Sequence, residues 1–520
     1  MLQHQINRHN KSISITLSSP VNGLNMRDNP LDMDAKFAIV MDNYIPLNNK
    51  VVLRKGYTSF LTTGARVETV TSYKNGNHQS LLAIWDRKLH NITSPNDETE
   101  FSSPNFSSNN CKTQQYKNYL YFVNGTDTPK VYYIDDNGVE HFENWGFSYE
   151  DGETNRYIAN VSVSKQRLWF VERNSLKVWY PETAGNIAGT LQCFDFSQVA
   201  RFGGNLVAVA NWTQDGGQGI DDLTVFITSE GEALVYSGSD INSADDWKLR
   251  GSYKISRPIG YNCLVAYQGD IIIISEDGYI PLSRALPLER ANSSQIAFSD
   301  AIAPLVAERT QKYASRSGWQ GIIYGRGGYG IFNVPVAGQF EQHVINLNNG
   351  AWCRFTGINA CCWHEFSGRL YFGSNDGVYL YDEGYSDNGT RISGVVEQAY
   401  TDLGTNNLKK IQLINPRTKS GGNYSLVIYT NMDMEKRKFD SQESIVSGGN
   451  SKWNQKKWST TGSSNGTKWS SLSANILSGQ WIANSSTGYK ASIVFKTKTK
   501  GNLIEWYDTC LRYQVGNGVL

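Results

Sequence analysis

The chain has 520 residues, of which 39% are hydrophobic and 12% aromatic, and its formal net charge at pH 7 is +1. A nearly neutral balance argues against a protein that binds nucleic acid over its whole surface. Tyr, Trp and Gly are abundant, with 29, 14 and 48 residues, which favours strands and turns over helices. No run of about 18 apolar residues occurs and the first residues are polar. We therefore expect neither a membrane span nor a secretory signal, and folding in the cytoplasm of the producing cell.

The first 60 residues show no hairpin pattern at their start and then two apolar stretches, Phe37 to Ile45 and Val51 to Leu53. We interpret residues 1–60 as an N-terminal arm that also closes the domain after it. A strand within Val51 to Thr58 is expected to complete the last repeat of that domain, because closure removes exposed sheet edges.

Residues 61–389 contain seven short apolar hairpins, whose leading strands follow one another at intervals of 39 to 57 residues. Periods of about 40 to 50 residues are typical of β-propeller blades. The sequence therefore predicts an all-β fold with a seven-bladed propeller, within a range of six to eight blades. Strands that recur by chance in a β-rich chain are the alternative. The centres of the leading strands are Leu82, Tyr121, Trp169, Phe226, Ile273, Ile322 and Tyr371.

Glycine-containing turns separate the paired strands of several repeats. Gly231, Gly278 and Gly377 each follow an acidic residue between two apolar runs. We expect these glycines to supply the positive φ that a tight hairpin needs. The repeat around Ile273 fits the period least well, because its second strand arrives early.

A helical insertion interrupts the repeats at residues 293–315, where apolar residues follow a roughly helical spacing. Ser293 or Ser294 is a candidate for the residue that caps its start. Pro304 lies in the middle of this segment and is expected to kink or split the helix.

Residues 390–520 lack the period and contain strand-like stretches separated by a Ser/Gly/Asn-rich tract, which predicts a C-terminal antiparallel β-sandwich. This region is also basic, since residues 401–520 hold 16 Lys and Arg against 7 Asp and Glu. Such asymmetry indicates a surface that faces a polyanion, or alternatively a solvated surface that keeps sheet edges apart. The candidate contact residues are Lys409, Lys410, Arg417, Lys419, Lys436, Arg437 and Lys438.

The sequence contains no motif that is typical of a catalytic site. The seven His are dispersed, and the seven Cys are odd in number and lack a C-x-x-C pair, which fits buried thiols in a reducing compartment. The stretch Gly325 to Gly330 spells G-x-G-x-x-G, but a strand follows it where a dinucleotide site needs a helix. We therefore predict no enzyme activity, no cofactor and no catalytic or metal site.

Several segments resemble tail nozzle, or packaged-DNA stabilisation, propeller proteins of short-tailed, podovirus-like bacteriophages. The opening Gly23-Leu24-Asn25 is followed by Asn43-Tyr44-Ile45-Pro46 and Arg54-Lys55-Gly56. Two longer matches are Asn348 to Phe355 and Gly368 to Tyr379, and a third is Asp387-Asn388-Gly389. The likeness covers most of the chain, but its motifs are turns and strands.

The resemblance implies a structural virion protein of the phage tail, made in the host bacterial cytoplasm. Such a subunit would form a homo-oligomeric ring, usually a hexamer, below the portal-adaptor ring and would contact distal tail or fibre proteins. It would extend the DNA-ejection channel, help retain packaged DNA and touch DNA without sequence preference. Two alternatives remain. One is a receptor- or glycan-binding tail propeller that uses Trp453, Trp458, Trp469 and Trp481, for which a place in the core of the sandwich is the alternative. The other is a propeller glycosidase.

Overall fold

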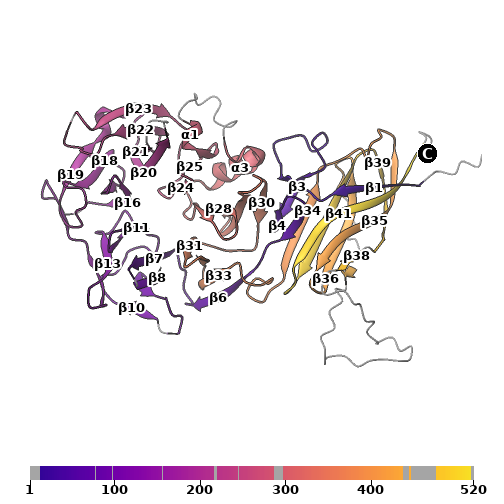
Figure 1. Ribbon diagram of the computed structural model, residues 1–520, viewed down its shortest axis with the longest axis horizontal. Coiled ribbons are helices and arrows are strands. Elements are labelled where there is room, and N and C mark those ends of the chain that lie inside the picture. Colours follow the sequence, from indigo (N-terminus) through magenta and orange to yellow (C-terminus); the bar gives the residue numbers. More distant parts are fainter. Residues whose placement is uncertain are drawn as a thin grey trace, which may run out of the picture. The chain divides into compact units, whose positions relative to one another are not determined.

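The computed structural model has an all-β fold made of many small sheets (Figure 1). It describes residues 12–76, 78–96, 98–154, 156–215, 220–243, 245–285, 297–436, 444–446, 476–478 and 480–516. The chain divides into two compact units. One contains residues 1–58, 343–357 and 382–520, here the terminal unit, and the other contains residues 59–342 and 358–381, here the repeat unit. This division differs from the predicted boundaries at residues 60 and 389, because the N-terminal segment belongs with the C-terminal strands.

In the repeat unit, the strands form small sheets that follow one another along the chain (Figure 1). The first three are β7 (Thr69–Asn75), β8 (His78–Trp85), β9 (Lys88–Asn91) and β10 (Thr99–Phe101); β11 (Lys112–Tyr116), β12 (Tyr119–Val123), β13 (Lys130–Ile134) and β14 (Glu140–Asn144); and β16 (Ile158–Ser164), β17 (Arg167–Glu172), β18 (Lys177–Pro181) and β19 (Gly189–Asp195), with β15 (Phe147–Tyr149) parallel to β19. The 3-10 turn η1 (Phe196–Gln198) follows β19.

Two further small sheets follow along the chain. After them come two more groups of strands, each of which belongs to a sheet that also includes strands from other parts of the chain. In chain order, the strands are β20 (Leu206–Asp215), β21 (Ile220–Thr228), β22 (Glu232–Ser237) and β23 (Lys248–Lys254); β24 (Leu264–Tyr267), β25 (Asp270–Ser275) and β26 (Gly278–Pro281); β27 (Gln320–Tyr324), β28 (Tyr329–Val336) and the start of β29 (Gln339–Asn346); and β31 (Cys362–Phe366), β32 (Arg369–Gly373) and β33 (Gly377–Tyr381).

The sheets of the repeat unit are joined in a closed circuit, mainly through their first strands. In chain order, β7 contacts β11, β11 contacts β16, β16 contacts β20, β20 contacts β25, β24 contacts β27, β27 contacts β31, and β31 contacts β7 again. Side-chain hydrogen bonds help to hold neighbouring first strands together. Thr71 Oγ1 lies 2.9 Å from Thr113 Oγ1, and Ser162 Oγ donates to the carbonyl oxygen of Val209 at 2.7 Å.

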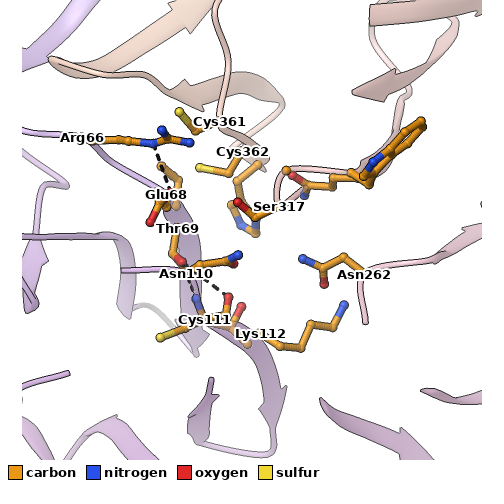
Figure 2. Close-up of a pocket in the computed structure, with 16 residues that line it drawn as sticks. Arg66, Glu68, Thr69, Asn110, Cys111, Lys112, Asn262, Ser317, Cys361 and Cys362 are labelled. Carbon is orange, nitrogen blue, oxygen red and sulfur yellow. Dashed lines mark hydrogen bonds and ion pairs between the residues drawn. The ribbon is translucent and has the colours of Figure 1, made fainter. Parts of the chain in front are cut away.

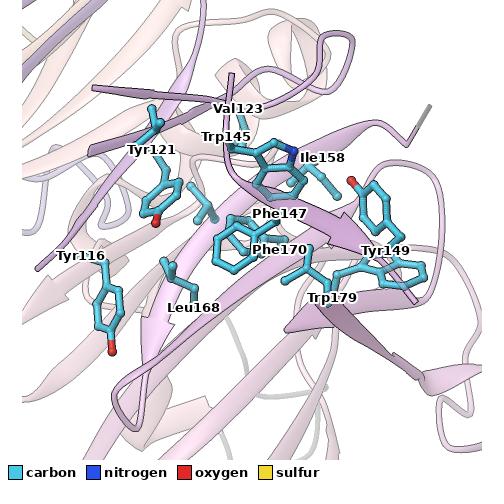
Figure 3. Packing of buried hydrophobic residues seen from close by; sticks show 13 residues of the cluster. Tyr116, Tyr121, Val123, Trp145, Phe147, Tyr149, Ile158, Leu168, Phe170 and Trp179 are labelled. Carbon is cyan, nitrogen blue, oxygen red and sulfur yellow. The ribbon is translucent and has the colours of Figure 1, made fainter. Parts of the chain in front are cut away.

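Aromatic side chains fill the space between adjacent sheets, as Figure 3 shows for the second and third sheets. Tyr121 of β12 lies edge-on to Phe170 of β17, with ring centroids 6.0 Å apart, and Trp145 packs on the same ring at 4.8 Å. Burying one large apolar side chain contributes roughly 1.5–3 kcal/mol. This packing explains why apolar strand centres recur in the sequence.

All seven predicted strand centres lie in strands. Six occupy the second strand of their sheet and one occupies the first. Ile322 lies on the first strand of its sheet, β27, and pairs with Ile331 of β28. The early second strand after Ile273 is also present, as β26. The other six centres, Leu82, Tyr121, Trp169, Phe226, Ile273 and Tyr371, lie on the second strands of their sheets.

The last small sheet ends with a strand from the N-terminal part of the chain. Its order is β31-β32-β33-β6, where β6 spans Tyr57–Thr62. The predicted closing segment, Val51 to Thr58, is therefore displaced toward the C-terminus, because Val51–Leu53 (β5) pairs with β4 (Tyr44–Pro46) instead. The reason predicted for Gly377 is also wrong. Its φ is not positive, and it is needed because an added Cβ would lie 2.3 Å from the carbonyl oxygen of Leu61.

The helical insertion is present, but Pro304 does not kink it. The 3-10 turn η3 (Asp300–Ile302) leads into α3 (Ala303–Tyr313), and Pro304 lies in the first turn of α3. Proline is tolerated there because first-turn N–H groups have no partner within the helix. A short helix, α1 (Leu282–Ala285), was not predicted. Ser293 and Ser294 lie outside the described residues.

The described residues of the terminal unit form two sheets. In one the order is β38-β35-β41-β5-β4, with β1 on β41 and β39 on β35, and the other includes β30-β3-β34-β40-β36-β37, with β2 on β3. The strands are β1 (Ser12–Ser18), β2 (Gly23–Leu24), β3 (Phe37–Asp42), β30 (Trp352–Phe355), β34 (Ile392–Gln398), β35 (Lys409–Ser420), β36 (Tyr424–Met432), β37 (Ser444–Val446), β38 (Ile476–Ser478), β39 (Ile482–Gly488), β40 (Ala491–Thr499) and β41 (Ile504–Val515).

The two sheets of the terminal unit are packed through aromatic side chains. Phe495 of β40 stacks on Trp506 of β41 with ring centroids 4.4 Å apart, and the hydroxyl of Tyr44 lies 2.7 Å from Thr497 Oγ1. The N-terminal strand β1 pairs along its whole length with β41. The N-terminal strands are thus part of this core.

Candidate functional site

Three of the segments that carry the family resemblance meet around one buried side chain in the terminal unit. Arg54 is fully buried, and its two terminal nitrogens donate to the carboxylate oxygens of Asp387 at 2.8 and 2.7 Å. Its remaining N–H groups donate to Asn43 Oδ1 and to the carbonyl oxygens of Lys55 and Thr356. All five guanidinium N–H groups therefore have an acceptor.

Other motifs of the terminal unit also contact segments far from them in the sequence. The side-chain amide of Asn349 donates to the carbonyl oxygen of Pro46 at 3.3 Å. Gly23 lies so close to β30 that an added Cβ would be 2.6 Å from the carbonyl oxygen of Trp352. Segments separated by more than 300 residues in the sequence are thus parts of one structural core.

The seven predicted basic residues are not equivalent in the structure. Lys409 is fully buried, and its ammonium group donates to the carbonyl oxygens of Thr405 and Asn407 at 2.6 and 2.8 Å. It cannot face a channel or a neighbouring subunit, so its inclusion in the predicted surface is wrong. The physical reason is the alternation of β35, which places Lys410 on the exposed side and Lys409 on the buried one.

The remaining predicted cations differ in their partners. Arg417 is exposed and pairs with Asp508 on the adjacent strand β41, and Lys419 Nζ lies 4.0 Å from Glu505 Oε2. Lys410 and Lys436 are exposed. Arg437 and Lys438 lie outside the described residues, as do Trp453, Trp458 and Trp469, while Trp481 is 45% exposed.

Two cavities that share lining residues open where the first strands of the repeat unit meet, and Figure 2 shows the smaller one. Their volumes are ≈ 210 and ≈ 640 Å³, and both are lined by Asn110, Lys112, Asn262 and residues Ser317 to Trp319. In Figure 2 the side chains of Asn110, Asn262 and Lys112 point into the same open space. The closed circuit of sheets therefore leaves a polar hollow rather than a filled centre.

The two cavities differ in charge. In the smaller one, Glu68 is neutralised by Arg66, whose Nε lies 3.1 Å from its carboxylate. The larger one is lined by Lys112, Arg173 and Arg316, and its lining contains no Asp or Glu among the described residues. Burial lowers the pKa of Lys112, and no carboxylate raises it again.

The thiols and the histidine of the smaller cavity are not poised for catalysis. Burial raises the pKa of Cys361 to about 11 and that of Cys362 to about 12, so both stay protonated near neutral pH. Burial lowers the pKa of His364 to about 4, and its Nε2 lies 2.8 Å from Ser72 Oγ. His364 is consequently neutral near pH 7.

The remaining sequence motifs have structural explanations. Residues Gly325 to Gly328 form the turn between β27 and β28, where the N–H of Gly328 donates to the carbonyl oxygen of Tyr324. No group of three metal-ligating side chains occurs in the described part of the chain. Within the same residues, no helix is both long and apolar enough to cross a membrane. All seven cysteines are free.

Sequence reasoning missed the cavity cations because each is isolated in the chain. Lys112 opens β11, Arg173 follows β17 and Arg316 follows α3, and only the closed circuit brings them to one cavity. The available signal was weak. Each of the three lies at or just beyond the end of a strand or helix, where a search for local clusters of charge finds nothing.

No family model and no curated protein matches the chain. Among solved structures, a streptogramin B lyase is similar with a TM-score of 0.36 and 12% identity, over 62% of this chain and 96% of that one. Sqt1 of Saccharomyces cerevisiae is similar with a TM-score of 0.35 and 8% identity, over 64% of this chain and 98% of that one. Likeness at this level supports no argument about function.

Proposed function

We propose that the chain is a structural subunit of a phage tail, a nozzle protein that forms a ring below the portal-adaptor and extends the DNA-ejection channel. The observation that carries this proposal is the buried ion pair of Arg54 and Asp387. Three of the motifs that resemble nozzle proteins supply its residues, namely Asn43 to Pro46, Arg54 to Gly56 and Asp387 to Gly389. The segments that carry the likeness therefore lie together in one structural core of this chain.

The architecture in this proposal is a seven-bladed propeller formed by the repeat unit, together with a β-sandwich formed by the terminal unit. The contacts from β7 through β31 and back to β7, and the stacking of Phe495 on Trp506, support it. Such rigid bodies suit a ring subunit, because each presents fixed loops to its neighbours. In the virion the ring would be a hexamer that contacts adaptor and distal tail or fibre proteins.

The DNA-facing surface proposed for this ring includes Lys410, Lys419 and Lys436 together with Arg437 and Lys438. Lys409 is excluded because it is buried, and Arg417 is a weaker candidate because it pairs with Asp508. A sliding genome requires weak phosphate contacts without base readout. A few cations on each subunit, repeated around a ring, meet this requirement.

Mass photometry and negative-stain electron microscopy test the assembly. The chain is measured alone and together with portal-adaptor rings of a short-tailed phage. We expect a six-fold ring on the adaptor, and a monomer alone remains compatible because such a ring can form on a template. A chain that stays monomeric with every tail partner present contradicts the proposal.

A second measurement tests the cations. In assembled rings, replacing Lys436, Arg437 and Lys438 together by Gln should weaken binding of duplex DNA. The salt slope should fall by roughly 0.9 for each phosphate that the variant no longer neutralises. Arg417→Gln is the matched control with a small expected effect. Equal slopes in the parent and the triple variant would remove these three residues from the proposed channel.

A further inference from the structure

The larger cavity of the repeat unit has the features of a site for a charged ligand. Its volume of ≈ 640 Å³ lies within the usual range for small-molecule sites, about 300–1,000 Å³. Lys112, Arg173 and Arg316 contribute three positive charges, and no carboxylate lines it among the described residues. The neutral lining is rich in hydrogen-bonding groups, with the amides of Asn110, Asn124 and Asn262.

The three cations have no ion-pair partner in the described part of the chain. Arg173 donates to the carbonyl oxygen of Gly125 at 3.0 Å, which orients its guanidinium group but leaves its charge unpaired. The neighbouring carboxylate of Glu172 is taken by Arg156, whose Nη1 lies 3.2 Å from it. The guanidinium group of Arg316 lies over the ring of Tyr313, at 5.7 Å. The positive charge of the cavity is therefore not balanced within the lining.

Of the three cations, Lys112 costs the most free energy when no anion is bound. It lies half-buried on the first strand β11 and lines both cavities. In Figure 2 its side chain extends into the open space that Asn110 and Asn262 also border. Removing a charge from water without a partner costs free energy. A residue that destabilises the free protein in this way is typical of a binding site, where the ligand provides the missing charge.

We propose that this cavity binds a small multivalent oxyanion, a compound that carries two or more phosphate or carboxylate groups. Lys112 contacts the anion at the centre, and Arg173 and Arg316 contact it from two other segments. The side-chain amides of Asn110 and Asn262 donate hydrogen bonds to the same ligand. This site is separate from the cations of the terminal unit and does not depend on the proposed role in the tail.

Isothermal titration calorimetry of the full chain at low salt tests the site, with tripolyphosphate and citrate as separate probes. We expect saturable binding of at least one probe. Lys112→Gln and Arg316→Gln should each weaken it about tenfold, because each removes one charge-assisted contact. The matched control is Lys248→Gln, an exposed lysine on the outer strand β23, which should leave the affinity unchanged.

The outcomes separate the sources of the negative charge. Binding of both probes assigns the site to multivalent anions in general, and binding of one assigns it to phosphate or to carboxylate compounds. No saturable binding of either probe, or equal affinity in the parent and both variants, overturns the proposal. So does duplex DNA that binds the repeat unit where neither small probe does.

Thermal unfolding shows whether a variant that binds less anion is still folded. Without anions, Lys112→Gln should unfold at the same temperature as the parent or a higher one, because a charge is removed from a partly buried position. With tripolyphosphate the parent should gain more than the variant. If Lys112→Gln does not fold, the exposed Arg316→Gln still decides the question.

Discussion

Arg54 and Asp387 form a bidentate ion pair across 333 residues of the chain, with the guanidinium group fully buried. The pair joins the turn before β6 to the segment before β34. Asn43 completes it, since its Oδ1 accepts from both Arg54 Nε and the N–H of Thr356. Because every donor is satisfied, the charge is tolerated inside the terminal unit.

Breaking this ion pair should destabilise the terminal unit strongly. Asp387→Asn leaves the buried guanidinium without a counter-charge, which is expected to cost about 3–5 kcal/mol in the free energy of unfolding. Urea denaturation followed by Trp fluorescence measures the loss. Arg417→Gln breaks the exposed pair with Asp508 and should cost less than about 1 kcal/mol. Similar losses in the two variants would contradict the importance assigned to the buried pair.

Gly56 should not tolerate a side chain. An added Cβ would lie 1.9 Å from the carbonyl oxygen of Ser386, and the N–H of Gly56 donates to the carbonyl oxygen of Gly384. Gly56→Ala must therefore displace the backbone around Asp387, with an expected loss of about 1–3 kcal/mol in unfolding free energy. Gly325→Ala is the control, because its added Cβ meets no atom within 4 Å. A loss in Gly56→Ala no larger than in this control would refute the steric argument.

The closing strand β6 should loosen when Gly377 is replaced. The Cβ of Gly377→Ala would lie 2.3 Å from the carbonyl oxygen of Leu61, so β6 must move away from β33. Amide hydrogen exchange measures the result. The N–H groups of Thr63 and Gly64, which donate to the carbonyl oxygen of Asp376, should exchange faster, while those of β16 and β17 should not change. Unchanged exchange at Thr63 would show that β6 keeps its place beside β33 despite the added methyl group.

Much of the repeat unit could be predicted from the sequence, because each hairpin carries its own signal. Aromatic strands and a glycine turn such as Gly231, whose φ is +73°, are local features that recur with the sheets. The partners of the N-terminal strands could not be predicted. The alternation of β1 shows which residues share a face, but not that Ile13 pairs with Tyr513 at the other end of the chain.

The cations of the terminal unit and those of the larger cavity also differ in how far the sequence predicts them. A window of sequence finds the dense group between Lys409 and Lys438, yet it does not separate Lys409 from Lys410 unless the two-residue period of β35 is applied. Lys112, Arg173 and Arg316 are spread over about 200 residues and become neighbours only through the closed circuit of sheets. Charge density along the chain is a poor guide to charge density in space.

The stability of the repeat unit should fall in mild acid because of His364. This residue lies on β31 with its side chain against Ser72 of β7, and burial lowers its pKa to about 4, below the value of about 6.5 expected in the unfolded chain. Between these two pH values the unfolded chain binds a proton that the folded protein does not. Unfolding therefore becomes easier as the pH falls, by about 1.4 kcal/mol for each pH unit.

His364→Gln should remove this dependence, so the difference in unfolding free energy between parent and variant should change from pH 6.5 to pH 4 and stay constant above pH 7. Urea denaturation at half-unit pH steps measures it. Ser72→Ala is the matched control, because it removes the hydrogen-bond partner of Nε2 at 2.8 Å but keeps the titrating ring, and its acid dependence should resemble that of the parent. A constant difference between parent and His364→Gln at pH 4.5 and pH 7.5 would show that the ring reaches water in the folded protein and that the small cavity is open at this point.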